Sequence, residues 1–200
     1  MFASLILKFP RAYSLFGALV GGEGRRRFTE NHVRPFPGQR ILDIGCGPAD
    51  ILEVLPADIV YVGFDESEQY VDAARRRYAQ RGEFRRARVT RELVGQYKGF
   101  DLVLALGILH HLDDAQCATL LEIAREALVP GGRFVSLDGC YLEGQSRVAR
   151  YLLRRDRGKF VRSADQYLAL AASVFGALEH RVYEDLMRIP YTHLVMECTR

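Results

Sequence analysis

The sequence predicts an α/β domain in which a mostly parallel sheet carries helices on both faces and ends in an antiparallel hairpin. Short apolar runs alternate with longer segments whose apolar residues recur at helical spacing, which is the pattern of a doubly wound sheet. A glycine-rich turn follows the first apolar run directly. Two extended runs near the C-terminus are joined by so few residues that their strands must be antiparallel.

The first run, residues 41–44, is typical of a buried parallel strand, and it breaks at Gly45 and Gly47. Glycine lacks a Cβ, so it allows a sharp turn and lets a ligand approach the backbone closely. Pro48 suits the first turn of a helix, and we therefore expect a helix to begin there with its free amides facing a ligand. Asp43 would lie at the carboxyl end of the strand, where open α/β sheets bind ligands. A purely structural turn is the alternative.

The second strand, residues 59–65, ends in Asp65, which stands 22 positions after Asp43. Nucleotide-binding α/β units place an acid at this spacing, because two carboxylate oxygens match the paired hydroxyls of a ribose. The first turn does not read Gly-x-Gly-x-x-Gly, so the fingerprint of dinucleotide-binding proteins is not met.

The other elements follow in order along the chain. A leading segment, residues 2–20, has helical apolar spacing and is expected to end at Gly21 and Gly22, as either a packing arm or a lid over the site. We expect further helices over residues 69–81 (capped by Ser67), 114–128, 147–157 and 164–175, strands within 84–90 and over 102–106 and 133–138, and hairpin strands over 181–188 and 192–198 joined by 189–191.

Four stretches, in the expected order, resemble the class I S-adenosylmethionine-dependent methyltransferases. They are Leu42-Asp43-Ile44-Gly45-Cys46-Gly47, Asp65 after the second strand, residues 100–112, and Leu128-Val129-Pro130-Gly131-Gly132-Arg133-Phe134-Val135. The resemblance covers roughly residues 40–138. It implies a Rossmann-like methyltransferase fold with seven strands, S-adenosylmethionine as cofactor, and methyl transfer to a small-molecule acceptor. The domain of residues 1–200 then divides into an N-terminal helical lid or arm (1–38), a cofactor-binding core (39–140), and substrate-side helices with the hairpin (141–200).

Two positions depart from the family pattern. Ala49 stands where relatives usually have a third glycine. The stretch of residues 84–90 holds three arginines and no acid, whereas relatives usually place there the acid that reads the adenine amino group. Adenine must therefore be recognised by backbone groups or stacking, or cofactor binding is weakened.

The resemblance implies a cofactor site along one edge of the sheet. Asp43, Gly45 and Gly47 would shape the methionine pocket, and Asp65 would hold the ribose. The whole expected cofactor-binding set is Asp43, Gly45, Cys46, Gly47, Asp65, Glu66, Arg88, Val89, Leu106 and Gly107, with Glu66 flanking the adenine and Leu106 and Gly107 passing close to the sulfonium.

His110 and His111 follow the fourth strand and are the candidates for a general base, since neutral imidazole accepts a proton near pH 7. The alternative is that one of them caps or packs and that catalysis proceeds by positioning alone. Asp138 and Tyr141, after the fifth strand, and Tyr13 from the leading segment are expected to line the acceptor side. No cluster of acids and imidazoles has the spacing of metal ligands, so no metal is predicted.

Composition narrows the function further. The net charge is +3, and 25 of the 28 basic residues are arginines scattered over several predicted helices, which argues against nucleic acid as the partner. The four separated cysteines are typical of free thiols in a reducing cytoplasm, and we expect neither a secretory segment nor a membrane span. No oligomeric state is assigned. An RNA methyltransferase and a non-catalytic S-adenosylmethionine-binding scaffold are the two rival functions.

Overall fold

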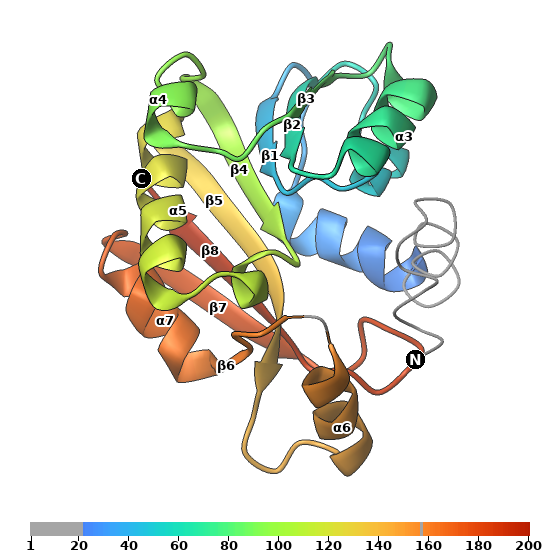
Figure 1. Cartoon of the computed structure of the whole chain (residues 1–200), viewed down its shortest axis with the longest axis vertical. Coiled ribbons are helices and arrows are strands. Elements are labelled where there is room, and N and C mark those ends of the chain that lie inside the picture. The colour runs from blue at the N-terminus through green and yellow to red at the C-terminus, as the bar shows by residue number, and fades with distance from the viewer. Residues whose placement is uncertain (1–21, 157) are drawn as a thin grey trace.

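The computed structural model describes residues 22–156 and 158–200, which form a layered α/β domain (Figure 1). Its main sheet has seven strands in the order β3-β2-β1-β4-β5-β8-β7. Neighbouring strands from β3 to β5 are parallel, whereas β8 runs antiparallel to both β5 and β7. The strands are β1 (Arg40–Ile44), β2 (Val60–Asp65), β3 (Glu83–Arg86), β4 (Phe100–Leu106), β5 (Leu128–Tyr141), β7 (Ala177–Tyr183) and β8 (His193–Thr199), and a two-residue β6 (Arg162–Ser163) pairs with β5 outside this order. The predicted fold class is thereby confirmed.

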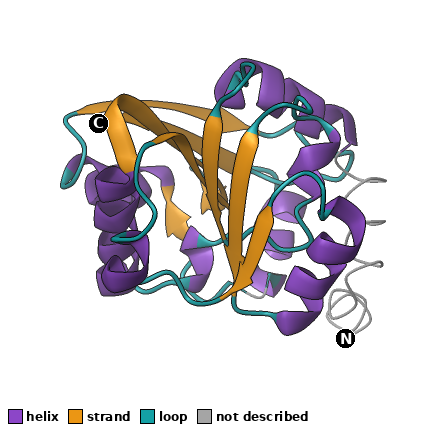
Figure 2. Ribbon diagram, turned by 90° about the horizontal axis from the view of Figure 1, so that it is seen from above, coloured by secondary structure: helices purple, strands orange, loops and turns teal. Residues whose placement is uncertain are grey.

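Helices cover both faces of the sheet (Figure 2). On one face α4 (Arg91–Val94), α5 (Asp114–Ala127) and α7 (Ala164–Ala172) share a core with the strands. On the other face the core is closed by residues 22–28, the π-helix η1 (Thr29–Val33), the 3₁₀ helix η2 (Asp50–Glu53) and α3 (Glu68–Tyr78). A short 3₁₀ helix, η3 (Leu109–His111), follows β4, and α6 (Arg147–Arg155) lies beyond the end of β5. None of the helices in these described ranges is long and apolar enough to cross a membrane.

Side-chain caps fix where several helices begin. The Ser67 hydroxyl accepts a hydrogen bond from the Tyr70 amide, as the sequence predicts for the start of α3. A capping box starts α5, where Asp113 and Gln116 satisfy each other's backbone amides. A second capping box, built around Ser163, starts α7. These local signals explain why the helices following β2, β4 and β6 are close to their predicted positions.

The prediction that a helix begins at Pro48 is wrong. Ala49, the next residue, is in the left-handed region (φ 58°, ψ 35°), and it leads only into the four-residue η2. A left-handed residue cannot continue a right-handed helix, so the chain turns again before η2. Ala49 is also where relatives usually have glycine, which adopts this conformation without steric cost.

The C-terminal hairpin is present, but its first strand lies earlier than predicted. Strand β7 ends at Tyr183, and the connection to β8 runs from residue 184 to 192 instead of 189 to 191. Three consecutive residues in the middle of β7, Glu179, His180 and Arg181, are polar and exposed, because this strand lies at the edge of the sheet, and they interrupt any apolar run. Leu186, in the connection, is buried in the core against residues 22–33. Its burial explains why the apolar residues of 181–188 were predicted to form a strand.

The helix break expected at Gly21 and Gly22 is not observed at Gly22, which is the one of the two that the structure describes. Gly22 instead begins a helix that continues to residue 28. This helix packs closely on the connection before β8: a Cβ added to Gly24 would lie 1.8 Å from the Leu186 carbonyl oxygen. Arg25 forms an ion pair with Glu53 of η2 at 2.7 Å. Residues 22–33 therefore act as a packing arm, and the lid expectation for residues 1–21, with Tyr13, lies outside the described residues.

Candidate active site

The glycine turn after β1 is tied to the end of β2. The amides of Gly45 and Cys46 both donate to the Phe64 carbonyl oxygen, at 2.8 and 3.0 Å. Gly45 and Gly47 have φ values of 77° and 54°, so both need the left-handed conformation that glycine allows. A Cβ on Gly45 would lie 2.5 Å from the Ile108 side chain, whereas one on Gly47 would meet nothing within 4 Å. The turn is thus closed on the side of Gly45 and open to a ligand at Gly47.

Asp43 lies beneath this turn and is almost fully buried, with 2% of its surface exposed. The Tyr61 hydroxyl donates a hydrogen bond of 2.5 Å to Asp43 Oδ2, while Oδ1 has no hydrogen-bond partner. Burial raises the pKa of Asp43 to about 7, although the bond from Tyr61 opposes that rise. Tyr61 was not among the predicted site residues, because its place inside the apolar second run reads simply as core.

Asp65 ends β2 as predicted, and it also holds the turn in place. Its Oδ2 accepts from the Gly47 amide at 3.0 Å and its Oδ1 from the Ser67 amide at 2.8 Å. Burial raises the pKa of Asp65, and these two hydrogen bonds partly counter the rise. Each carboxylate oxygen keeps a further lone pair, so the side chain can still accept from ribose hydroxyls.

The region expected to meet adenine consists of surface ion pairs. Arg88 and Glu66 are both exposed and approach to 3.5 Å, and Arg86 pairs with Glu68 at 3.2 Å. The Ala87 amide donates to the Asp65 carbonyl oxygen at 3.1 Å, which fixes the segment after β3 beside the end of β2. Val89 is partly buried against the core. The structure thus brings Glu66 and Arg88 together at the surface.

Leu106 and Gly107 end β4 at the same edge of the sheet. Leu106 pairs with Leu137 of β5, and the Gly107 amide donates to the Leu137 carbonyl oxygen at 2.8 Å. Gly107 is exposed and has a positive φ of 73°. A Cβ at Gly107 would lie 3.8 Å from the imidazole of His110, so the end of β4 and this histidine are neighbours.

His110 is buried and held by a carboxylate on the adjacent strand. Asp138 Oδ1 accepts from both the His110 amide, at 3.2 Å, and the ring Nδ1, at 2.8 Å. Burial alone would lower the pKa of His110, but the pull of Asp138 and of Asp156 outweighs it and raises the pKa to about 9. The charged form with a proton on both ring nitrogens is thus the resting form at neutral pH.

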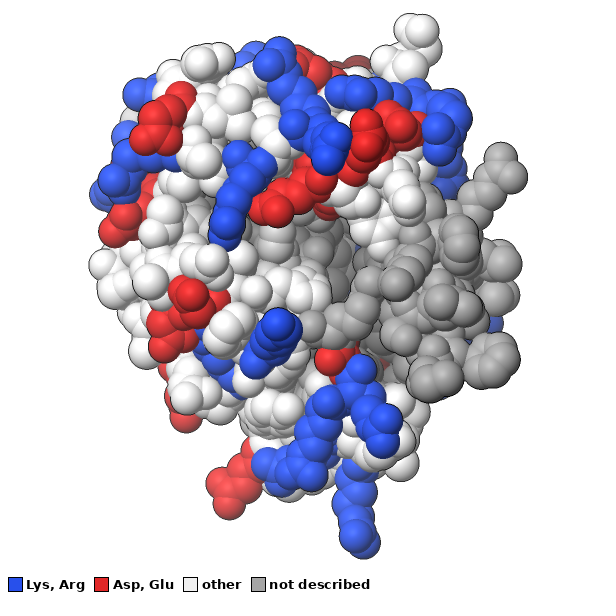
Figure 3. All heavy atoms as spheres, in the orientation of Figure 1, with Lys and Arg blue, Asp and Glu red and all other residues white. Residues whose placement is uncertain are grey.

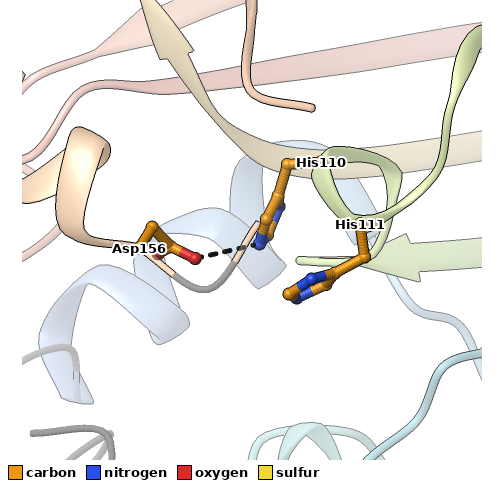
Figure 4. Close-up of side chains that lie close together, drawn as sticks. All are labelled: His110, His111 and Asp156. Carbon is orange, nitrogen blue, oxygen red and sulfur yellow. Dashed lines mark ion pairs between the residues drawn. The ribbon is translucent and has the colours of Figure 1, made fainter. Parts of the chain in front are cut away.

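Asp156, at the end of α6, approaches the other side of the His110 ring (Figure 4). Its Oδ1 lies 3.5 Å from His110 Nε2, and its Oδ2 accepts a hydrogen bond of 2.9 Å from the Tyr191 hydroxyl. The His111 ring is exposed, and its centroid lies 4.2 Å from that of His110. Neither Asp156 nor Tyr191 was predicted, since they come from parts of the chain far from the family motifs.

Of the predicted acceptor-side residues, the structure brings Asp138 to His110 and leaves Tyr141 at the end of β5. The Tyr141 ring is partly exposed and lies under the guanidinium of Arg150 at 5.9 Å, a cation–π contact between β5 and α6. The predicted site residues in the described ranges therefore lie at the ends of strands β1 to β5 or in the segments directly after them.

A family model for a methyltransferase domain matches residues 42–134, the segment that carries the ends of strands β1 to β4. A protein of Chelativorans sp. (strain BNC1) called ubiquinone biosynthesis O-methyltransferase is 31% identical over 154 residues, which are 70% of this chain and 60% of that protein. The chain is similar to class I methyltransferases in sequence and in fold. The cofactor of that family is S-adenosylmethionine, as the sequence resemblance implied.

Other similarities agree with this methyltransferase fold. A solved S-adenosylmethionine-dependent methyltransferase from Archaeoglobus fulgidus superposes with a TM-score of 0.73 at 15% identity, covering 94% of this chain and 99% of that one. A human protein called probable tRNA methyltransferase 9B is 34% identical over 103 residues, which are 50% of this chain and 21% of that protein. Three of the ubiquinone-biosynthesis relatives each align with 70% of this chain. The chain spans about three fifths of the length of these three proteins.

Proposed function

We propose that this methyltransferase transfers the methyl group of S-adenosylmethionine to a hydroxyl oxygen of a small aromatic acceptor. The proposal is supported by relatives called ubiquinone biosynthesis O-methyltransferase, a name that describes methyl transfer to oxygen during assembly of a quinone. In the reaction an acceptor oxygen forms a bond to the methyl carbon, the carbon–sulfur bond breaks, and its electron pair goes to sulfur. The hydroxyl proton leaves to a base or to solvent.

The observation that carries the proposal is the pair of histidines directly beside the predicted methyl position. Gly107 neighbours the His110 ring, and both follow the end of β4. Asp138 and Asp156 face the two nitrogens of His110, whereas the His111 ring is exposed. This geometry favours His111 as the proton acceptor and His110 as the residue that positions it. The four cysteines, free and buried, are in keeping with a reducing cytoplasm as the place of action.

The surface supports a small acceptor over RNA. Figure 3 shows arginine and lysine side chains interspersed with acidic ones over the upper part of this face. Arg86 and Arg88 pair there with Glu68 and Glu66, so their charges are partly compensated where the adenine is expected. A further basic group lies over α6, at the lower edge of Figure 3. RNA remains the other arm of the test.

The test measures S-adenosylhomocysteine released with a panel of dihydroxylated aromatic acceptors and, separately, with total tRNA. We expect release with at least one aromatic acceptor and none with tRNA. His111→Asn should lower turnover roughly 10²–10⁴-fold if His111 is the base, whereas the matched variant His180→Asn, changed at an exposed position on β7, should keep it. Methylation of tRNA alone would contradict the proposal. Failure to bind S-adenosylmethionine in calorimetry would favour a scaffold.

A further inference from the structure

A group of three potential metal ligands lies at the acceptor end of the site. The ring nitrogens of His110 and His111 and a carboxylate oxygen of Asp156 all lie within 4.8 Å of one another (Figure 4). They come from η3 and from the end of α6, two segments more than forty positions apart in the sequence. No spacing of metal ligands is visible in the sequence, because folding alone brings the two segments together.

We propose that His110, His111 and Asp156 bind a divalent transition-metal ion. Two imidazole nitrogens and one carboxylate oxygen form a donor set that suits zinc, iron, cobalt or nickel better than magnesium or calcium, which prefer oxygen alone. Three protein ligands also match the count that leaves a coordination position open to another molecule.

The separation of the ligand atoms fits such an ion. His110 Nε2 and Asp156 Oδ1 are 3.5 Å apart, which is longer than an ordinary hydrogen bond. Ligands at about 2.0–2.1 Å around a tetrahedral zinc ion are roughly 3.3–3.4 Å from each other. The exposed His111 ring needs only a side-chain rotation to complete the set, since its nitrogen is already within 4.8 Å of the other two ligand atoms.

Both of the inner ligands are supported by a second residue, as in established metal sites. Asp138 holds His110 Nδ1 at 2.8 Å, so Nε2 points to the candidate ion position, where the ion displaces the Nε2 proton on binding. The Tyr191 hydroxyl and the Gly158 amide each donate to the Asp156 carboxylate, both at 2.9 Å. The Phe160 amide donates to the His110 carbonyl oxygen at 3.0 Å, which holds the segment after α6 against η3. These contacts orient the ligand atoms and do not merely place acids on a surface.

The electrostatic balance also favours a cation with two charges. Asp138 and Asp156 bring two carboxylates to one imidazole pair. The guanidinium of Arg162, which lies beside η3, is turned to Asp114 and to the carbonyl oxygens of Leu109 and Leu112. It therefore compensates other groups.

The test is metal binding by the full chain, purified without a histidine tag and treated with a chelator. Zinc chloride is titrated in calorimetry, and cobalt chloride is followed by its visible absorption. We expect one ion per chain, with affinity lowered at least about tenfold by Asp156→Asn and by His111→Ala, in keeping with the effect of removing a supporting ligand contact. His180→Ala is the matched control and should bind as the unchanged protein does.

Three results would overturn the proposal: no zinc or cobalt bound by the unchanged protein, equal binding by His111→Ala, or a loss in His180→Ala as large as in His111→Ala. His111 is exposed, so its replacement leaves the core intact, and the urea unfolding midpoint verifies this. Because no methyl acceptor is present, the outcome is independent of the proposed methylation, in which His111 acts as base in the metal-free protein.

Discussion

The buried carboxyl of Asp43 should make the cofactor-free protein less stable as pH rises. Its pKa is raised from 3.8 to about 7 in the fold, mainly by burial. A group whose folded pKa is raised contributes stability that is fully present below its unfolded pKa and is lost as pH rises through the folded one. The whole difference corresponds to about 4 kcal/mol, at about 1.4 kcal/mol per pKa unit.

The measurement is urea unfolding of the cofactor-free protein and of Asp43→Asn at two pH values. Between about pH 5.5 and pH 8.5 the Asp43 contribution should fall by about 2 kcal/mol, because only the part from pH 5.5 to about 7 lies in that interval. The amide keeps the shape and can still accept the Tyr61 hydrogen bond, but it does not titrate. The difference between the two proteins isolates Asp43 from the other titrating groups.

Two outcomes separate the reasoning from its alternatives. Relative to the unchanged protein, Asp43→Asn should gain about 2 kcal/mol of stability between the lower and the higher pH. Tyr61→Phe removes the hydrogen bond that opposes the rise, so its stability should decline over a wider pH range. Parallel pH profiles for the unchanged protein and Asp43→Asn would refute the assignment of a raised pKa to this carboxyl.

Three further changes test the cofactor half and the core. Asp65→Ala should weaken S-adenosylmethionine binding by about 1.5–3 kcal/mol in calorimetry, and Asp65→Asn should lose less because it keeps one acceptor for the turn; equal affinity of all three proteins would refute the ribose role. Ala49→Gly should change the free energy of unfolding by less than about 1 kcal/mol, because relief of about 1–2 kcal/mol of left-handed strain offsets the lost buried methyl group and the added entropy of the unfolded chain. Ala49→Val should lower the free energy of unfolding by more than about 2 kcal/mol, measured by urea titration as well. Arg162→Met should cost about 3–5 kcal/mol, because it leaves Asp114 and three carbonyl oxygens without their donor; a loss below 1 kcal/mol would contradict that accounting.

Recognition of adenine without a carboxylate gives one more test. The arginines in β3 and directly after it form ion pairs with Glu66, Glu68 and Glu83, and a guanidinium cannot accept a hydrogen bond. Backbone carbonyl oxygens around residues 87–90 are then the acceptors for the exocyclic amine. Replacing S-adenosylhomocysteine by its analogue without that amine should cost less than about 3 kcal/mol, the upper range for one such bond; a larger loss in calorimetry would mean that an acid reads the amine.

The cofactor half of the site could be predicted because its signals are local. Asp43 and Asp65 each lie at or near the end of an apolar run. Gly45 and Gly47 adopt the left-handed conformation that glycine allows, so two closely spaced glycines after a strand indicate the tight turn. The wrong helix start at Pro48 is explained by the next residue. Proline is a favourable first residue of a helix, but Ala49 is in the left-handed region and is fully buried in the core. Propensity could not show that, since the strain is offset by packing.

The acceptor half could be predicted only in part, because long-range contacts build it. His110 draws together three segments: η3 through its own backbone, β5 through Asp138, and the end of α6 through Asp156. Tyr191, just before β8, donates to Asp156 and adds a fourth. The sequence shows two adjacent histidines and a later acid, but it does not show that the His110 ring reaches the buried carboxylate of Asp138. Since Asp156 joins a segment far from the family motifs to a histidine next to the methyl position, a change in α6 can alter the acceptor side without touching the cofactor side. That separation explains how a common cofactor edge can be combined with an acceptor site particular to this chain.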